Sequence, residues 1–421
     1  MKRLILFILF IGIILISSGW VYGQGHQPFE SQWQSVLNQT VWRVGPFYLV
    51  PRIKLNNIGY DANVYREREE DEPITDYTAT FSPELTAYLL VGHSIILSFR
   101  ENPEYVFYLN TERERRWNHI YSPEIRWKIL NRFVLGGKYE YSNRRFRFSS
   151  EVDFRVNTFV KKYEGSLFYE TGRQSSLGVR YSHQNFTYQD VDIPEADYPF
   201  FSRLSRDEDE ISGELYYQVL SDSFFFIRGG YTQYRFLEVE AAWRDSDSSQ
   251  VYAGLQFPLL GRMRGNLSLG YKSFMPLAED RDDFSGLVGE ADLEYRMRLF
   301  RLRAGYTRDS RFSYWTEALY FIENRIKGGL SFYLSPSLRL DYDYTYGEND
   351  YLEEVFWRGP EGELILTQRQ DIYTSHTLGV AVRVLRDIGI ALNLNYWKRD
   401  TNIYYGTRYW WFVGGSLVYD F

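Results

Sequence analysis

The chain has 421 residues, a formal net charge of −7, no cysteine and an aromatic share of 19%, to which 37 tyrosines contribute most. The mildly acidic balance gives no reason to expect nucleic acid as a partner, and a mean hydropathy of −0.41 argues against a helical membrane protein. Strands that are apolar on only one face remain compatible with that hydropathy.

The N-terminus has the pattern of a secretory signal. Lys2 and Arg3 precede an apolar run from Leu4 to Ile16, and Ser17, Ser18 and then Val21-Tyr22-Gly23 follow it. An N-terminal membrane anchor is the competing interpretation, but the apolar run is shorter than the roughly 20 residues that a spanning helix needs. We therefore predict a signal peptide over 1–23, cleaved after Gly23, and an exported mature protein.

Residues 24–45 are predicted to form a separate periplasmic segment before the strands begin. Its apolar residues are spaced as on one face of a short amphipathic helix; they are Phe29, Trp33, Val36, Leu37 and Val41. Such a helix would either lie free in the periplasm or enter the mouth of the domain that follows. A loose leader without secondary structure remains the alternative.

From residue 46 onward, runs of alternating apolar and polar residues follow one another, separated by turn residues. They predict eighteen strands, with sixteen as the alternative, near 46–60, 76–90, 94–109, 118–130, 132–143, 157–170, 174–188, 208–220, 223–237, 248–258, 262–275, 284–298, 300–312, 318–334, 337–348, 368–384, 387–399 and 407–421. Short turns alternate with long loops, as in an outer-membrane barrel with tight periplasmic turns and longer outer loops. The fold expected for 46–421 is an all-β, antiparallel, up-and-down transmembrane β-barrel.

The two faces of the predicted strands differ in polarity. In 337–348, Leu338 and Leu340 share one side, while Arg339 and Asp341 share the other. Successive side chains of a strand point to opposite faces, so one face carries charges that need water and the other suits hydrocarbon. We predict that the charged face lines a lumen and that the apolar face meets outer-membrane lipid.

Basic residues outnumber acidic ones among the positions predicted to face the lumen. The principal basic candidates are Arg126, Lys128, Arg296, Arg298, Arg301, Arg303, Arg325, Lys327 and Arg339. A cationic wall attracts anions, which favours a path for an anionic or sugar-like solute. The alternative is structural: ladders of paired charges that brace the wall and confer little selectivity.

The last strand ends on an apolar face that includes Leu417, Tyr419 and Phe421. A soluble domain seldom ends on an aromatic residue, because chain ends fray and expose it. An aromatic end is expected if this strand pairs with the first one and closes a barrel in lipid. The pattern resembles the C-terminal assembly signal of bacterial outer-membrane barrels. This resemblance implies recognition by the barrel-assembly machinery and a location in the outer membrane of a Gram-negative-type bacterium.

The sequence carries no convincing catalytic constellation. His183 lies in Ser182-His183-Gln184-Asn185, which is similar to the His-x-Ser-Asn pattern of outer-membrane phospholipases, but Asn185 stands where that pattern requires serine. Ser182 would point to the opposite face of the strand from His183, which breaks the geometry of a nucleophile and its base. The sequence has no phosphate-binding loop, metal-ligand motif or haem motif, so we expect neither an enzyme nor a cofactor.

Residues 43–65 contain Gly45-Pro46, a second proline at Pro51, and then Gly59-Tyr60-Asp61-Ala62-Asn63-Val64. This stretch resembles the start of a family of β-barrel porins found beside exopolysaccharide synthesis genes. The resemblance implies an exit pore for a secreted polysaccharide, working with a periplasmic polysaccharide-export protein, and it supplies no catalytic residues. A general or anion-preferring diffusion porin is the first alternative. The second is a scaffold barrel that sheathes a partner complex.

Overall fold

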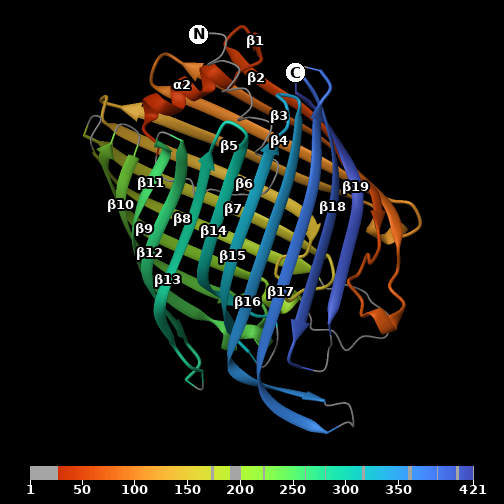
Figure 1. The fold of residues 1–421 in the computed structure, drawn as a ribbon. Coiled ribbons are helices and arrows are strands. Elements are labelled where there is room, and N and C mark those ends of the chain that lie inside the picture. Colours follow the sequence, from red (N-terminus) through yellow and green to blue (C-terminus); the bar gives the residue numbers. More distant parts are fainter. Residues whose placement is uncertain are drawn as a thin grey trace.

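The computed structural model describes residues 27–420, except 172–174, 190–200, 221–222, 261, 280, 315–317, 359–362, 386 and 404–406. In this part of the chain, eighteen strands from β2 to β19 pair antiparallel with their neighbours in sequence (Figure 1). The last strand, β19, also pairs with β2, from Phe412 opposite Asp61 to Asp420 opposite Arg52. This pairing closes the sheet. The predicted all-β barrel of eighteen strands is therefore confirmed, and the alternative of sixteen is wrong.

The barrel strands are β2 (Phe47–Asp61), β3 (Asp76–Val91), β4 (Ile95–Tyr108), β5 (Arg116–Ile129), β6 (Phe133–Phe146), β7 (Val156–Glu170), β8 (Ser175–Gln189), β9 (Arg206–Leu220), β10 (Ser223–Phe236), β11 (Ser246–Leu260), β12 (Met263–Pro276), β13 (Phe284–Arg296), β14 (Phe300–Phe312), β15 (Tyr320–Tyr333), β16 (Leu338–Arg358), β17 (Leu364–Arg383), β18 (Ile388–Thr401) and β19 (Arg408–Asp420). A short strand, β1 (Trp42–Val44), folds back on β2 through a turn at Gly45, whose φ of +60° suits glycine. Short 3-10 helices lie in four loops: η1 (Glu69–Asp71), η2 (Glu112–Glu114), η3 (Phe201–Leu204) and η4 (Val239–Arg244).

The observed strands begin and end close to the predicted ones, except at one hairpin. β16 reaches Arg358 and β17 starts at Leu364, where the sequence predicts a long outer loop. The register shifts by a bulge after Asp350, and the two strands then continue as a hairpin. The side chains of Tyr351 and Val355 are fully buried against neighbouring loop residues. This packing, which the local sequence does not reveal, extends the two strands.

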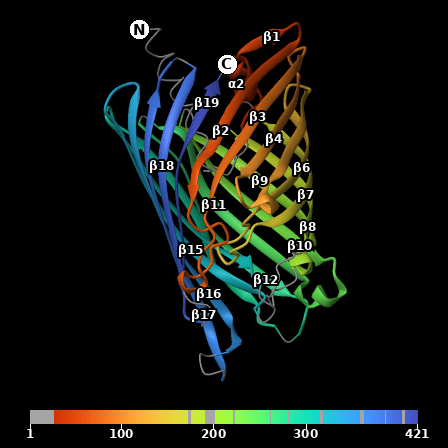
Figure 2. The same cartoon turned by 90° about the vertical axis from the view of Figure 1, so that its right-hand side faces the viewer.

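The two ends of the barrel differ. Helix α2 (Phe29–Gln39) and the end of β19 lie at one end, and the hairpin of β16 and β17 extends from the other (Figure 1, Figure 2). We refer to these as the mouth end and the loop end. Turns at the mouth end are short, for example between β3 and β4, whereas the segments 62–75 and 147–155 at the loop end are long. Since outer-membrane barrels keep their tight turns in the periplasm, the mouth end is the periplasmic end.

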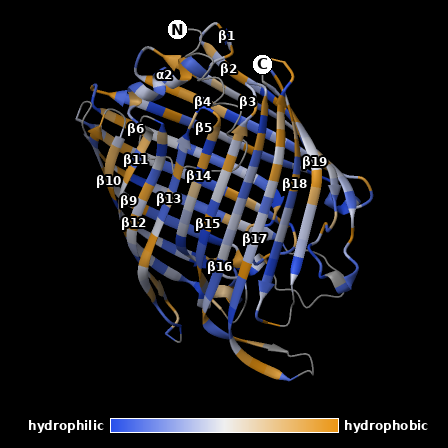
Figure 3. Cartoon of the chain, viewed as in Figure 1, coloured by the Kyte–Doolittle hydropathy of each residue, from blue (hydrophilic) through white to orange (hydrophobic). Residues whose placement is uncertain are grey.

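Hydrophobic and hydrophilic residues alternate along the barrel strands (Figure 3). On β12, Leu269 is 64% exposed on the outer face, whereas Lys272 is 6% exposed on the inner face. Other strands also expose apolar side chains on the outer face, among them Leu167, Val179, Leu215, Val251, Leu287, Leu302, Leu330, Leu340, Leu378, Leu392 and Val413. The outer wall is thus apolar around most of the barrel, as contact with lipid requires.

Aromatic rings pack against one another across the outer face of β4 to β7. The ring centroids of Tyr105 and Trp117 are 5.0 Å apart, and those of Tyr139 and Tyr163 are 4.9 Å apart. Such side chains favour the boundary between hydrocarbon and water, where the ring is in an apolar medium and its polar group is wet. The high tyrosine content of the chain therefore has a physical role on this surface.

Candidate functional site

Six of the nine basic residues predicted to line the lumen form ion pairs with carboxylates of the inner wall. The pairs are Arg126 with Glu124, Arg296 and Arg301 with Glu294, Arg303 with Asp343, Arg325 with Glu323, and Arg339 with Asp341. The nitrogen–oxygen distance is 2.8 Å for Arg303 and 2.6 Å for Arg339. These pairs connect charged groups within the wall, as the structural alternative expects. They do not balance one for one, since Glu294 also pairs with Arg264 and so has three arginine partners.

The other three predicted basic residues differ from one another in position. The ammonium nitrogen of Lys128 lies 5.7 Å from the centroid of the Phe29 ring of α2, and Lys327 lies on the inner face of β15. The sequence predicts Arg298 within a strand, but β13 ends at Arg296, and Arg298 is exposed in the turn before β14. The prediction that the strand extends to Arg298 is therefore wrong, because the pairing of β13 with β14 ends before it, whereas its role in lining the lumen stays a prediction.

Two residues of the predicted assembly signal lie in the seam that closes the barrel. Leu417 is opposite Leu55, and Tyr419 is opposite Ile53, in the pairing of β19 with β2. Phe421 lies outside the described residues. The predicted signal thus overlaps the strand on which closure of the barrel depends.

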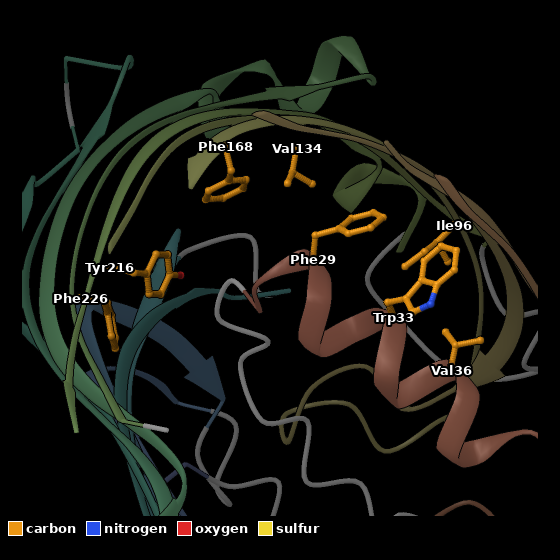
Figure 4. Packing of buried hydrophobic residues seen from close by; sticks show 8 residues of the cluster. All are labelled: Phe29, Trp33, Val36, Ile96, Val134, Phe168, Tyr216 and Phe226. Atoms are coloured by element: carbon orange, nitrogen blue, oxygen red, sulfur yellow. The ribbon is translucent and has the colours of Figure 1, made fainter. Parts of the chain in front are cut away.

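Helix α2 lies inside the mouth of the barrel (Figure 4). Its apolar face consists of Phe29, Trp33 and Val36, which are at most 8% exposed. These side chains lie in one cluster with inner-wall residues of β4, β6, β7, β9 and β10, namely Ile96, Val134, Phe168, Tyr216 and Phe226. We call these eight residues the mouth cluster. Of the arrangements that the sequence leaves open, the structure shows the helix within the mouth.

One polar contact fixes the start of α2. The N–H of Phe29 donates a hydrogen bond of 2.9 Å to Oε1 of Glu170 on β7, and the first N–H groups of a helix otherwise lack a partner. Burial of a large apolar side chain contributes about 1.5–3 kcal/mol, and a hydrogen bond to a charged group about as much. The conformational entropy lost when the helix is ordered opposes these contributions.

The segments of the described chain include no helix long and apolar enough to cross a membrane.

At the loop end, residues 147–155 between β6 and β7 cross the lumen to the far wall. Glu151 is fully buried and accepts a hydrogen bond of 2.8 Å from the hydroxyl of Ser313, which follows β14. Arg399 on β18 donates to the backbone carbonyl of Glu151 over 2.6 Å and to the carboxylate of Asp153 over 2.7 Å. The segment therefore contacts the opposite side of the barrel and narrows the passage.

The segment between β2 and β3 joins this crossing. Arg147 and Arg155 both donate to the backbone carbonyl of Val64, over 2.8 Å and 3.0 Å. We call the parts that meet, 61–67 and 147–155, the loop node. Two segments that are far apart in sequence thus form one packed restriction inside the barrel.

Burial perturbs the ionisable groups of the loop node. Removal from water raises the pKa of the Glu151 carboxyl above its ordinary value, against the opposing effect of the Arg369 charge. Burial lowers the pKa of Arg147 to about 9, and it lowers the pKa of Arg66 well below its usual range. The guanidinium of Arg66 lies 3.7 Å from the centroid of the Trp397 ring, which stabilises a cation there. The node therefore depends on close pairing between buried charged groups and their partners.

Reasoning from the sequence misses the loop node. Asp153 and Arg399 are 246 positions apart, so no local pattern reveals their contact. One signal is present in the sequence, because Val152 and Phe154 alternate with charged residues in a segment that lies between two predicted strands. Both apolar side chains are buried in the structure. Apolar residues in this segment between strands therefore indicate that the segment folds into the barrel.

Comparison of the sequence with known proteins gives no family. No known family and no curated protein matches the chain. Among solved structures, it is similar to the outer membrane protein OpdK of Pseudomonas aeruginosa, with 10% identity over 89% of this chain and 98% of that one, and a TM-score of 0.49. OccAB2 of Acinetobacter baumannii gives 12% identity, coverage of 89% and 98%, and a TM-score of 0.48. OccK3 of P. aeruginosa gives 12% identity, coverage of 92% and 98%, and a TM-score of 0.47.

The architecture of the chain itself defines its class. The sheet closes on itself, exposes apolar side chains outward and holds charged side chains inside. A closed sheet leaves no unpaired edge to the hydrocarbon, which is what a strand protein needs in order to span a bilayer. The molecule is a transmembrane β-barrel of the kind that spans the outer membrane of Gram-negative bacteria.

Proposed function

We propose that this protein is a gated outer-membrane channel and that its solute is a secreted polysaccharide leaving the cell. The observation that carries the gating is the mouth cluster, in which Phe29, Trp33 and Val36 place α2 inside the periplasmic mouth. The loop node narrows the opposite end. A general diffusion porin needs a continuous water-filled path, and restrictions at both ends of the lumen disfavour that function in this resting arrangement.

The polysaccharide is inferred from residues 43–65, which resemble the start of porins found beside exopolysaccharide synthesis genes. In such a system the partner is a periplasmic export protein. It approaches from the mouth end, where it can displace α2. An anion-preferring diffusion porin is the second candidate, and it is favoured by Arg144 on β6, which has no carboxylate partner in the described chain.

Planar-bilayer recording tests the gating. The double variant Phe29→Ala, Trp33→Ala should raise the open probability at least tenfold, because each lost anchor contributes more than the roughly 1.4 kcal/mol that a tenfold change requires. Leu37→Ala is the matched control, since Leu37 is on the same helix but is 40% exposed and outside the mouth cluster. Large steady currents from the wild type, unchanged in the double variant, would contradict gating and support the diffusion porin.

The solute is tested in the same helix-released variant. Polysaccharide fragments added on the mouth side should block the ionic current reversibly and should reach the other side of the bilayer. A released barrel that conducts ions but is neither blocked nor crossed by fragments contradicts polysaccharide export. A barrel that stays closed after release of α2 supports the scaffold alternative.

A further inference from the structure

A cavity of about 350 Å³ lies in the inner wall of the barrel and is lined by residues of β9 to β14. Tyr216 and Phe226 line it and also belong to the mouth cluster (Figure 4), so the cavity adjoins the place where α2 docks. Ligand pockets span about 300–1,000 Å³, and a cavity at the lower end of that range has room for one sugar unit. A polysaccharide that has passed α2 would meet this part of the wall first.

The wall of this cavity is unusual because the inner face of β11 carries no charged residue from Ser246 to Gln256. Ser248 is 1% exposed on that face, whereas Val251 is 50% exposed on the outer face. Strand alternation therefore turns Gln250, Tyr252 and Gln256 inward, and all three line the cavity. Amide and hydroxyl groups thus stand here, where neighbouring parts of the wall carry ion pairs.

Three polar side chains of the lining form no hydrogen bond with any other described residue, namely Gln256 on β11, Asn266 on β12 and Thr307 on β14. Each is partly exposed. Gln256 is directly opposite Asn266 in the pairing of the two strands, so their amides lie side by side. An amide offers both donors and an acceptor, which matches the hydroxyl groups of a sugar.

An aromatic ring lies beside these amides. A Cβ atom at Gly270 of β12 would be 2.4 Å from the ring of Tyr252, so the ring occupies the space over that glycine. The hydroxyl of Tyr252 donates a hydrogen bond of 3.4 Å to Oε1 of Gln250. A sugar ring has an apolar C–H face that packs on an aromatic ring while its hydroxyl groups bind polar side chains. The lining offers both kinds of contact.

The charged groups on the β7 to β10 side of the cavity balance one another. Arg228 lies 3.4 Å from Glu214, which Arg180 also approaches to 3.1 Å. The cations of this group are Lys162, Arg180 and Arg228, and the carboxylates are Glu164, Glu210 and Glu214. Three positive charges stand against three negative charges, so this side favours neither an anion nor a cation.

The charges on the β12 to β15 side balance as well. The carboxylates there are Glu290, Asp292, Asp309 and Glu323, and the cations are Lys272, Arg311, Arg325 and Lys327. Arg308 also lines the cavity, but its guanidinium donates over 2.7 Å to Asn324, which alternates with the inward residues of β15 and so faces outward. The cavity therefore has no surplus of charge that would select an ionic ligand.

We propose that this cavity binds one unit of a neutral polysaccharide, with Gln256, Asn266 and Thr307 bonding its hydroxyl groups and Tyr252 packing on its ring. This assignment rests on the proposed function, for which it names the substrate class as a neutral rather than a charged polysaccharide.

Isothermal titration calorimetry on the full chain in detergent tests the site without requiring conduction. The probes are two matched pairs of disaccharides: galactobiose with digalacturonate, and N,N′-diacetylchitobiose with its deacetylated, cationic form. At least one neutral disaccharide should bind, and at least tenfold more tightly than its charged counterpart. The wild type and the Phe29→Ala, Trp33→Ala variant are both titrated, so that a closed mouth does not hide the site. Absence of binding by both neutral probes, or equal affinity for the charged counterpart, overturns the proposal.

The double variant Gln256→Ala, Asn266→Ala should weaken binding of the neutral disaccharide at least tenfold, because it removes both amides. Gln184→Ala is the matched control and should leave binding unchanged, since Gln184 is an inward amide of β8 outside the cavity and donates over 3.5 Å to Ser182. Gln256→Leu keeps the size of the side chain and should also weaken binding, should the double variant fail to fold. Equal losses in the amide variants and the control, or no loss, overturn the assignment.

The two proposals fail in different experiments. Polysaccharide fragments that cross the released barrel without binding in calorimetry would remove the site and leave the proposed function. Neutral disaccharides that bind in calorimetry, while no fragment blocks or crosses the barrel, would leave the site and remove polysaccharide export.

Discussion

The backbone N–H of Phe29 donates a hydrogen bond of 2.9 Å to the carboxylate of Glu170, although the two residues are 141 positions apart. Phe29 begins α2, and Glu170 ends β7 at the mouth end. A carboxylate beside the first turn of a helix accepts a hydrogen bond from an N–H group that would otherwise be unpaired, and it interacts favourably with the helix dipole. The contact therefore ties the start of the mouth helix to the barrel wall.

Replacement of Glu170 should loosen α2. Glu170→Ala is expected to weaken docking of the helix by about 1.5–3 kcal/mol, the value of a hydrogen bond to a charged group, and so to raise the open probability by about tenfold or more. Glu170→Gln keeps an acceptor but loses the charge, so its effect should be smaller. Single-channel recording measures both variants. An unchanged open probability in Glu170→Ala would show that this contact does not hold the helix.

A charge on the outer wall should destabilise the barrel. Leu392 is 63% exposed on the outer face of β18, between other apolar outward residues. Leu392→Arg should lower the free energy of unfolding by roughly 2–4 kcal/mol, because the charge enters hydrocarbon. Asn393→Arg, on the inner face of the same strand, should cost much less. Denaturant titration of protein refolded in lipid vesicles measures both, and the reverse order would invert the assignment of the two faces.

The protonation of Glu151 in the loop node should make the folded protein more stable in acid. Burial raises the pKa of the Glu151 carboxyl, so the folded protein keeps a proton at pH values where the unfolded chain has lost it. Stability then falls as pH rises from the ordinary glutamate pKa, about 4.3, to the raised one.

Glu151→Gln has no proton to lose and is the reference for this effect. The free energy of unfolding of the wild type, relative to this variant, should decline as pH rises through that window. Denaturant titrations from acid to neutral pH give the comparison. A difference that is the same at every pH would contradict a proton held by Glu151.

The predicted assembly signal should act on targeting rather than on the fold. Phe421→Ser should reduce the amount of barrel found in the outer membrane, because the signal is expected to be recognised by the assembly machinery. Refolding of the purified variant in detergent should match that of the wild type. Heat-modifiable migration on gels measures the folded fraction in both settings. If the purified variant also fails to refold, Phe421 contributes to the stability of the barrel rather than to targeting alone.

The sequence by itself determined the barrel. Successive strand residues face opposite sides, so Arg339 and Leu340 had to lie on different faces, and the structure places them so. Turn residues at short intervals marked the strand ends, and the observed strands lie close to the predicted positions. Both signals are local, which is why one sequence was enough to predict the fold class and the lipid-facing surface.

Only the tertiary structure decided what occupies the lumen. The amphipathic pattern of α2 is visible in the sequence, but its place in the mouth depends on wall residues such as Phe168 and Tyr216. The loop node depends on pairs such as Asp153 and Arg399, which lie far apart in the sequence. The pair of Arg303 on β14 with Asp343 on β16 likewise joins two strands that are not neighbours in the sheet. Closure of the barrel brings these residues together, and no local stretch of sequence contains both partners of such contacts. Pairs two positions apart on one strand, such as Arg339 and Asp341, are the exception, because strand alternation already puts both side chains on one face.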